Sequence, residues 1–321
     1  MQKRRGADLA VHIVGSINID IITSLERLPM PGETVLAGAT ARLPGGKGAN
    51  QAVAAARMGA ATRMIGAVGE GDAGRWMKDR LAAEGIDISG VEVVPGEETG
   101  TAYIAVDAEG ENQIIVVSGA NARLKAPAPV EEGVLLSQLE VPVAALAPVF
   151  AQSRAVRILN TAPALLEARC LFDLVDILVL NEHELGVYVP STGEPPSHEG
   201  IVARARDLLA RADQAIVVTL GANGALAIRR DSYCHIPAVP VISVDTIGAG
   251  DCFCGALAAL LDEGRRLEEA LPIASAAAAL CTLGRGAVPS MPARGAVFDL
   301  LSGSATEHAL PIKNPAAASL S

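Results

Sequence analysis

A glycine-rich turn followed by an aspartate is the part of this sequence best suited to chemistry. Residues 244–255 read VDTIGAGDCFCG, and apolar residues at helical spacing then continue to Gly264. The turn at 248–250 leaves backbone N–H groups free at the positive end of a helix dipole, which is an anion site. This pattern predicts that Asp251 takes a proton from a hydroxyl while the turn stabilises a transferred phosphoryl group. The alternative is an aspartate that only caps the helix.

A second glycine-rich stretch surrounds a lysine. Residues 45–51 read GGKGANQ and lead into an alanine-rich helix that ends near Gly59. Backbone N–H groups and the Lys47 cation are thus brought together before a helix. The stretch is not a Walker A loop, because the spacing differs and no Ser or Thr follows the lysine. The alternative is a flexible turn with a solvated lysine, which the small, apolar helix behind it disfavours.

Polar side chains also follow a buried strand predicted over residues 9–17. Asn18 and Asp20 stand two apart, so in an extended chain they face the same way. Such a pair can bind vicinal sugar hydroxyls, although Asx residues also simply end strands.

Two further predicted strands end in polar or glycine-rich stretches, NEHE at 181–184 and TLGANG at 219–224. Open α/β sheets bind their ligands at the carboxyl ends of the strands. Asn181 and Glu184 are suited to a phosphate or to the waters of a metal ion, or else they form a helix start with acidic residues in its first turn.

Composition limits the classes of partner. The 321 residues are 50% hydrophobic and only 2% aromatic, which suits small aliphatic helices packed on a parallel sheet. The net charge of −10 argues against nucleic acid and anionic membranes as partners. Five cysteines without paired spacing indicate reduced thiols, and the basic start at 1–5 lacks a cleavage site, so we expect a cytoplasmic protein.

The elements that position these residues alternate between strand and helix. Strands are predicted at 61–69, 135–139, 156–159, 177–180, 216–220 and, before the catalytic turn, 239–244. Helices are predicted at about 75–84 and 268–283. This alternation is typical of an α/β fold, with a mostly parallel sheet covered by helices on both faces.

A smaller sheet is expected beside the main one. Strands at 91–94, 101–107 and 113–118, with those around Ile21 and Val35, predict a small antiparallel β lid, drawn from about 19–43 and 91–118. We expect one domain over 9–302 and a disordered tail at 303–321, where the sequence is rich in Ala, Ser and Pro.

One motif suggests a different function. Residues 69–74 match the dinucleotide fingerprint G-x-G-x-x-G, with Glu92 beyond it, which would indicate an NAD-dependent dehydrogenase. Glu70 and Asp72 would face the pyrophosphate, and the match lies outside the first strand–helix unit. We therefore interpret it as a chance match.

The two long motifs, 45–51 and 245–251, resemble the signatures of the ribokinase-like (PfkB) carbohydrate kinases. Shorter motifs follow in the family's order between residues 11 and 292: GSINID at 15–20, PGET at 31–34, GEN at 110–112, GAN at 119–121, LEVP at 139–142 and NEHE at 181–184. The resemblance implies ATP-dependent phosphorylation of a sugar's terminal hydroxymethyl group. Ribose is the favoured acceptor; another sugar or nucleoside (fructose, deoxyribose, 2-keto-3-deoxygluconate, adenosine) is the alternative.

The resemblance also implies roles for particular residues. Asp251 matches the catalytic base, with an anion hole made by Gly248, Ala249 and Gly250. Sugar-binding positions are matched by Asn18, Asp20, Gly46, Lys47, Asn50 and Glu140. ATP-binding positions are matched by Asn181, Thr219, Gly221, Gly224 and Ser275.

Ions and assembly follow from the same resemblance. Glu184 would lie near Mg²⁺, through water or phosphate. A site for an activating K⁺ is matched by Asp245, Ile247, Cys281, Gly284, Gly286 and Ser290. The resemblance further implies a homodimer formed through the lid sheet.

The chain departs from the family pattern in three places. Cys252 and Cys254 replace the more usual Thr and Asn after the base, and Ser275 stands where an Asn is common. Cys252, near a helix N-terminus, has either a lowered thiol pKa or, as we expect, a packing role. The short, proline-rich segment 122–133 is expected to change the surface more than the site.

Overall fold

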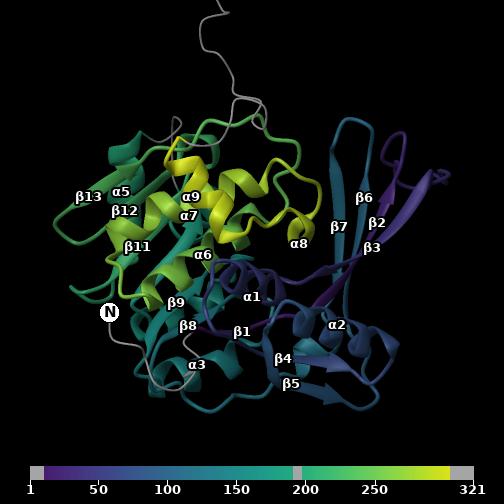
Figure 1. Ribbon diagram of the computed structural model, residues 1–321, viewed down its shortest axis with the longest axis horizontal. Coiled ribbons are helices and arrows are strands. Elements are labelled where there is room, and N and C mark those ends of the chain that lie inside the picture. Colours follow the sequence, from purple (N-terminus) through teal and green to yellow (C-terminus); the bar gives the residue numbers. More distant parts are fainter. Residues whose placement is uncertain (1–10, 191–196, 304–321) are drawn as a thin grey trace, which may run out of the picture.

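The computed structural model describes residues 11–190 and 197–303. Within them, nine strands form one sheet, in the order β13-β12-β11-β10-β9-β8-β1-β4-β5 (Figure 1). All neighbours from β11 to β5 are parallel, and β12 and β13 are added antiparallel. The strand bounds are β1 Val11–Val14, β4 Thr62–Gly69, β5 Asp87–Val94, β8 Val134–Ser137, β9 Val156–Asn160, β10 Ile177–Asn181, β11 Ala215–Thr219, β12 Ala225–Ile228 and β13 Tyr233–Ile236.

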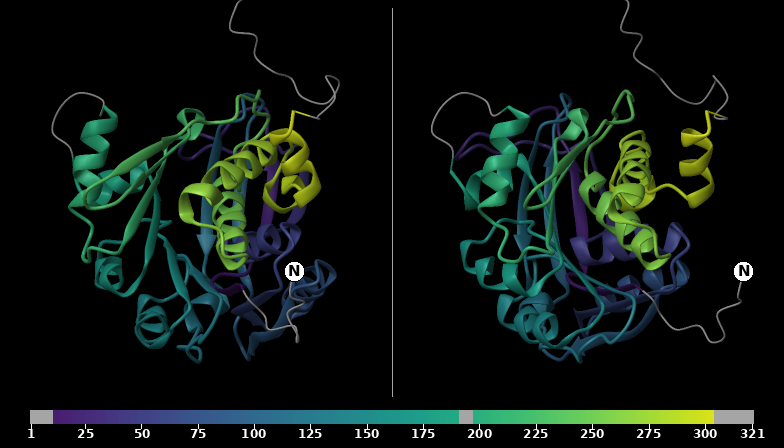
Figure 2. Two further views of the ribbon diagram at one scale, coloured as in Figure 1. Left: turned by 60° about the vertical axis from the view of Figure 1, so that its left-hand side comes forward. Right: turned by 90° about the vertical axis from the view of Figure 1, so that its left-hand side faces the viewer.

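Helices cover both faces of this sheet, which confirms the predicted fold class (Figure 2). Successive strand residues point to opposite faces, so Ile13 joins one buried cluster and Val14 the other. One face carries α1 Lys47–Arg57, α2 Asp72–Ala83, α6 Ala249–Asp262, α7 Leu267–Cys281, the short α8 Ala287–Ser290 and α9 Arg294–Leu301. The other carries the 3₁₀ segments η1 Gly119–Arg123 and η2 Leu166–Leu174, with α3 Val143–Gln152, α4 Glu182–Tyr188 and α5 His198–Arg206.

A second sheet of four strands stands at one side of the molecule and corresponds to the predicted lid (Figure 1). Its order is β3-β2-β6-β7, with a parallel pair β2–β6 between two antiparallel pairs. The bounds are β2 Asn18–Ser24, β3 Ala39–Gly45, β6 Gly100–Val106 and β7 Asn112–Val117.

Three strand predictions were wrong. Residues 91–94 belong to β5, at the edge of the main sheet, because α2 returns the chain parallel to β4 in a β-α-β unit. Val35 lies outside any strand, since β3 begins only at Ala39, opposite Ser24. Residues 239–244 are described and form no strand; Pro240 lacks the N–H that a ladder needs, and Val244 donates instead to the Thr282 carbonyl.

The helix predictions were correct to within a few residues. Close packing of α6 against α1 determines the position of the candidate site. Helix α6 begins after Gly248, whose φ of 80° is the left-handed conformation that glycine tolerates. A Cβ at Gly255 would lie 2.6 Å from the Cβ of Ala54, so this glycine lets α6 lie directly against α1. The two glycine-rich helix starts are thereby brought together.

One contact between the lid and the main body is made by the chain's single tryptophan. Trp76 of α2 lies under the guanidinium of Arg42 from β3, 4.6 Å from the ring centroid, and Arg80 lies 5.3 Å away. This cation–π contact connects a lid strand with a helix of the body.

No helix in the described ranges has the length and apolar character needed to cross a bilayer. All five cysteines are described, and each is a free thiol, as predicted. The predicted disordered tail lies outside the described residues except for Gly303, and the start at 1–5 lies outside them too.

Candidate active site

Asp251 lies buried at the start of α6 and is held by two amide groups from α1. Its Oδ2 accepts from Asn50 Nδ2 and its Oδ1 accepts from Gln51 Nε2, both at 2.9 Å. Asn50 Oδ1 is buried with no hydrogen-bond partner among the described residues. An unpartnered buried acceptor of this kind is suited to a ligand hydroxyl.

Charge around Asp251 is arranged for proton transfer. Burial raises the pKa of Asp251, while Lys47 and the two amide donors oppose that rise. The charge of Asp251 in turn raises the pKa of Lys47, which keeps the ammonium protonated. A raised pKa makes a carboxylate a stronger base, and the neighbouring cation favours its ionised form.

A cavity of about 240 Å³ opens in front of this carboxylate. It brings together predicted residues of three kinds: the base and its turn, the lysine, and the strand-end residues of β10 and β11. The predicted residues lining it are Lys47, Asn181, Glu184, Thr219, Gly248, Gly250 and Asp251. Gly221, Gly224 and Ser275 are not among its described lining residues; the glycines follow Thr219 in the same loop, and Ser275 lies on α7.

A second cavity, of about 400 Å³, contains predicted sugar-binding residues. Asn18 and Glu140 line it together with Asn121, whose Nδ2 donates to Asn18 Oδ1 at 2.7 Å. Glu140 Oε2 accepts from the backbone N–H of Lys47 at 3.0 Å. Lys47 borders the first cavity, so this bond links the two cavities.

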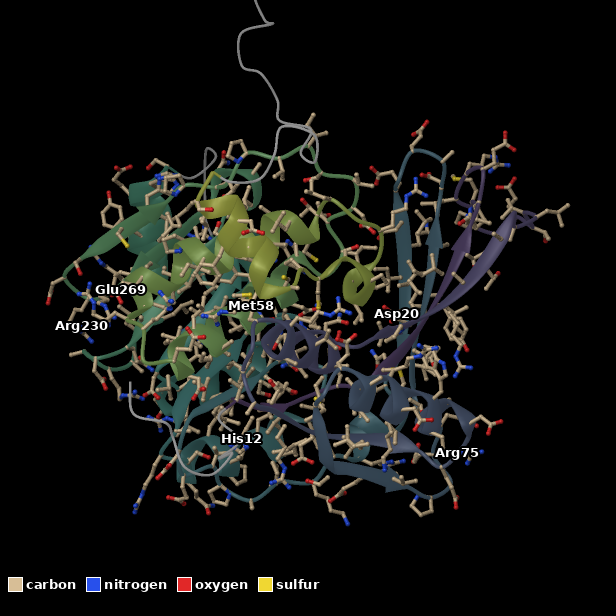
Figure 3. The ribbon with its side chains drawn as sticks, viewed as in Figure 1. His12, Asp20, Met58, Arg75, Arg230 and Glu269 are labelled. Atoms are coloured by element: carbon tan, nitrogen blue, oxygen red, sulfur yellow. The ribbon has the colours of Figure 1, made fainter. Side chains whose placement is uncertain are left out.

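Asp20 lies where the lid strands meet the rest of the molecule (Figure 3). Burial, followed by the charges of Glu140 and Asp251, raises its pKa to about 7, and Lys47 acts in the opposite direction. A Cβ at Gly45 would lie 2.0 Å from Asp20 Oδ1, so only glycine fits opposite this carboxyl. Gly46 follows with a φ of 87° and is the N-cap of α1.

The positions of Asn181 and Glu184 agree with both interpretations, a helix start and a site for phosphate or for the waters of a metal ion. They form a capping box, in which Glu184 N donates to Asn181 Oδ1 and Asn181 N donates to Glu184 Oε2. They also line the first cavity, and burial raises the pKa of Glu184. The described residues contain no group of three or more His, Cys, Asp or Glu side chains suited to a metal ion. A divalent ion here would therefore take most of its ligands from phosphate and water.

The residues predicted for the monovalent cation surround the catalytic turn. Asp245 Oδ1 accepts from Ile247 N at 2.9 Å, and its Oδ2 accepts from Gly286 N at 2.8 Å. Ser290 Oγ is buried and has no hydrogen-bond partner within the described ranges. A Cβ at Gly284 would lie 2.4 Å from that oxygen. This orphaned oxygen beside a glycine fits a cation ligand.

The two cysteines after the base are packing residues, as expected. Cys252 is buried and hydrogen bonded with Cys281, which raises the thiol pKa of Cys252. The prospect of a lowered Cys252 pKa was therefore wrong. Cys254 lines the first cavity, and burial raises its pKa as well.

Residues 9–294 match the pfkB family of carbohydrate kinases. The chain belongs to this family. It is therefore a phosphotransferase with an alcohol group as acceptor, as predicted, and the dinucleotide interpretation of 69–74 has no support.

Individual relatives agree with this assignment. The ribokinase of Bacillus subtilis is 37% identical over 300 residues, covering 90% of this chain and 98% of that protein. The structure of Thermotoga maritima ribokinase superposes with a TM-score of 0.84 at 34% identity, covering 92% of this chain and 99% of that one. The structure of Arabidopsis thaliana ribokinase complexed with ribose and ATP gives a TM-score of 0.81 at 34% identity, covering 91% and 98%.

Sequence reasoning missed several polar side chains behind and beside the site. Gln51 was noted only as the last residue of a motif, although it touches Asp251 directly. Asn121 binds Asn18 from the motif at 119–121, which had been noted without a role. Gln138 precedes the motif at 139–142 and carried no signal of its own.

Proposed function

We propose that this protein is a ribokinase, which converts ATP and D-ribose to ADP and D-ribose 5-phosphate. The observation that carries the proposal is Asp251, held by two amides at the wall of a cavity that Lys47, Asn181 and Thr219 also line. The similarity to ribokinases along nearly the whole chain supports ribose as the acceptor.

In this proposal the sugar lies between the lid and α1. Its hydroxyls are bound by the side chains of Asn18, Asp20, Asn50 and Glu140, close to the backbone of Gly46. Asp251 accepts the proton of the 5-hydroxyl as that oxygen attacks the γ-phosphorus. The positive charge of Lys47 and the N–H groups of the turn Gly248, Ala249 and Gly250 stabilise the charge on the phosphoryl oxygens.

The nucleotide would lie along the carboxyl ends of β10 and β11. Asn181 and Thr219 line the cavity there, and we assign Gly221, Gly224 and Ser275 to the rest of the ATP site. Mg²⁺, when bound with ATP, neutralises phosphate charge; Asn181 and Glu184 would hold it through waters and phosphate oxygens.

A panel of acceptors tests the proposal. The purified protein is incubated with Mg²⁺-ATP and ribose, deoxyribose, fructose, 2-keto-3-deoxygluconate or adenosine, and ADP release and the phosphorylated product are measured. We expect the highest kcat/KM with ribose and a 5-phosphate by phosphorus NMR. A higher kcat/KM with another acceptor would make this protein a kinase of that acceptor instead.

We further propose that K⁺ activates the enzyme. Asp245 ties the loop at Ile247 to Gly286, next to the orphaned Ser290 oxygen, and Cys281 and Gly284 complete the predicted shell. An ion there would hold the catalytic turn in place without touching the substrate. Rates should rise in K⁺ relative to tetramethylammonium, and Ser290→Ala should reduce that difference; equal rates in both salts would contradict it.

We also propose a cytoplasmic enzyme, because free thiols and the use of ATP suit that compartment. The exposed outer strand of the lid suits the homodimer that the family resemblance implies.

A further inference from the structure

Beside Asp251 lies a buried group of three amide side chains, one of which, Asn160, also lines the first cavity. Gln51, Gln138 and Asn160 are 0%, 0% and 8% exposed. Gln51 Nε2 donates both to Asp251 Oδ1 at 2.9 Å and to Asn160 Oδ1 at 3.2 Å. Gln138 Nε2 donates to Gln51 Oε1 at 2.6 Å. We call these three residues the amide relay.

The order of donors and acceptors in the amide relay is dictated by the carboxylate. An ionised Asp251 only accepts, so Gln51 must turn its Nε2 toward it and its Oε1 away. That oxygen then requires a donor, which Gln138 supplies. Asn160 is oriented in the same way, because its Nδ2 donates to the Val179 carbonyl at 3.3 Å.

The amide relay is anchored on the carboxyl ends of the parallel strands. Gln138 follows β8, Asn160 ends β9, and Val179 lies in β10. Gly15, just after β1, makes room for Gln138, because a Cβ there would lie 2.1 Å from Gln138 Oε1. Side-chain hydrogen bonds therefore connect Asp251, at the start of α6, with the carboxyl ends of β8 and β9 in the middle of the sheet.

We infer that Gln51 is a positioning residue for the general base, and that Gln138 and Asn160 hold Gln51 in the one orientation that serves it. The inference rests on the proposed function, in which Asp251 is that base. Gln51 lines neither of the two cavities at the site, so in the described structure its action passes through Asp251. Asn50, by contrast, has an oxygen left for the sugar.

Gln51→Met tests this role, since it removes the N–H donor and keeps the length of the side chain. The hydrogen bond from Gln51 lowers the pKa of Asp251, so losing it should raise that pKa further. We expect the acidic limb of the kcat profile to move to higher pH, so that kcat measured on that limb falls about tenfold. The KM for ribose should change less than about threefold, and activity should recover as the pH rises.

Gln214→Met is the matched control. Gln214 is equally buried, and its Nε2 donates to the carbonyls of Phe172 and Val175, away from the site. It should lower the melting temperature and leave the pH profile unchanged. A wild-type pH profile in Gln51→Met would overturn the inference, as would the same shift in Gln214→Met.

Two further variants separate the possible failures. If Gln51→Met does not fold, Gln138→Met provides the test, because it removes the donor to Gln51. An acidic limb at the wild-type pH in Gln138→Met would overturn the inference. Asp251→Asn is measured alongside. A nearly normal rate in Asp251→Asn would defeat the proposed base itself, whereas an inactive Asp251→Asn with a normal Gln51→Met would defeat the amide relay alone.

Discussion

The proposed sugar site contains two aspartates with different surroundings, the buried Asp251 and the half-buried Asp20. Asp251 accepts hydrogen bonds from two amides, which fix its orientation, and Lys47 opposes the rise of its pKa that burial causes. Asp20 is affected most by burial and by the negative charges of Glu140 and Asp251, so its pKa rises to about 7. At neutral pH the first is suited to remove a proton, while the second is divided between its two protonation states.

Replacing Asp251 with asparagine keeps the shape of the side chain and removes its basicity. We expect kcat to fall by more than ~10²-fold, the loss typical of a positioned base. Ribose affinity, measured by calorimetry, should stay within a few-fold of the wild type, because the sugar's other partners remain. A mutant with nearly normal turnover would contradict the assignment of Asp251 as base.

Asp20 should make ribose binding depend on pH. Its raised pKa means that the carboxyl is protonated below about pH 7 and ionised above it. If the ionised form accepts from sugar hydroxyls, ribose affinity should fall about tenfold per unit as the pH drops below 7. Calorimetric titrations between pH 5.5 and 8.5 measure this.

Asp20→Asn provides the control for that dependence. The amide does not titrate, so its ribose affinity should be weaker at pH 8 and nearly constant across the same range. A slope in Asp20→Asn equal to that of the wild type would assign the dependence to another group.

At the scale of elements, the start of α6 depends on one backbone conformation. Gly248 has a φ of 80°, and a Cβ there would lie 2.5 Å from the Cβ of Ala287. Gly264, at the other end of the same helix, has a φ of 82°, and nothing in the described part of the chain lies within 4 Å of a Cβ placed there. Alanine substitutions at these two glycines therefore separate the effect of backbone strain from the effect of a steric collision.

Gly264→Ala should lower stability by about 1–2 kcal/mol, the strain of a left-handed residue alone. Gly248→Ala should have the same strain and also a steric collision with Ala287, which would displace the turn at 248–250. It should therefore lower stability more than Gly264→Ala does and reduce kcat more than tenfold. Chemical denaturation and steady-state rates of both variants provide the test. Equal stability loss in the two, with full activity, would show that the turn adapts freely.

The sequence predicted most elements because their signals are local. Helix α6 was expected from apolar spacing and two glycines, and both were found at its ends. Residues 91–94 were assigned to the wrong sheet, because an alternating pattern does not specify which strand is the partner. The candidate site residues inside glycine-rich motifs were likewise predicted from local signals. The role of Gln51 was not, because it depends on a contact with a residue 200 positions away.

At the scale of the whole molecule, the lid leaves an apolar strand uncovered. Ile114, Ile115, Val116 and Val117 of β7 are 49–67% exposed, and Tyr103 on the neighbouring β6 is 49% exposed. Adjacent exposed apolar side chains of this kind indicate an association surface. Together with the family resemblance, they lead us to predict a homodimer that uses the lid.

Ile115→Glu places a charge in the middle of that surface. We expect sedimentation equilibrium to give a dimer for the wild type and a monomer for the variant, because a buried, unpaired carboxylate is costly. Leu301→Glu, on α9 and 42% exposed, is the matched control and should remain dimeric. A monomeric wild type would rule out the lid-mediated dimer at that concentration.

The stacking of Arg42 on Trp76 has a practical consequence for detecting movement of the lid. Since the chain has one tryptophan, all of its indole emission originates beneath a guanidinium carried by the lid. Any swing of the lid on sugar binding must alter that emission. The unlabelled wild-type enzyme thus contains its own optical reporter, and a stopped-flow measurement would show whether sugar binding changes its signal and how fast that change is relative to turnover.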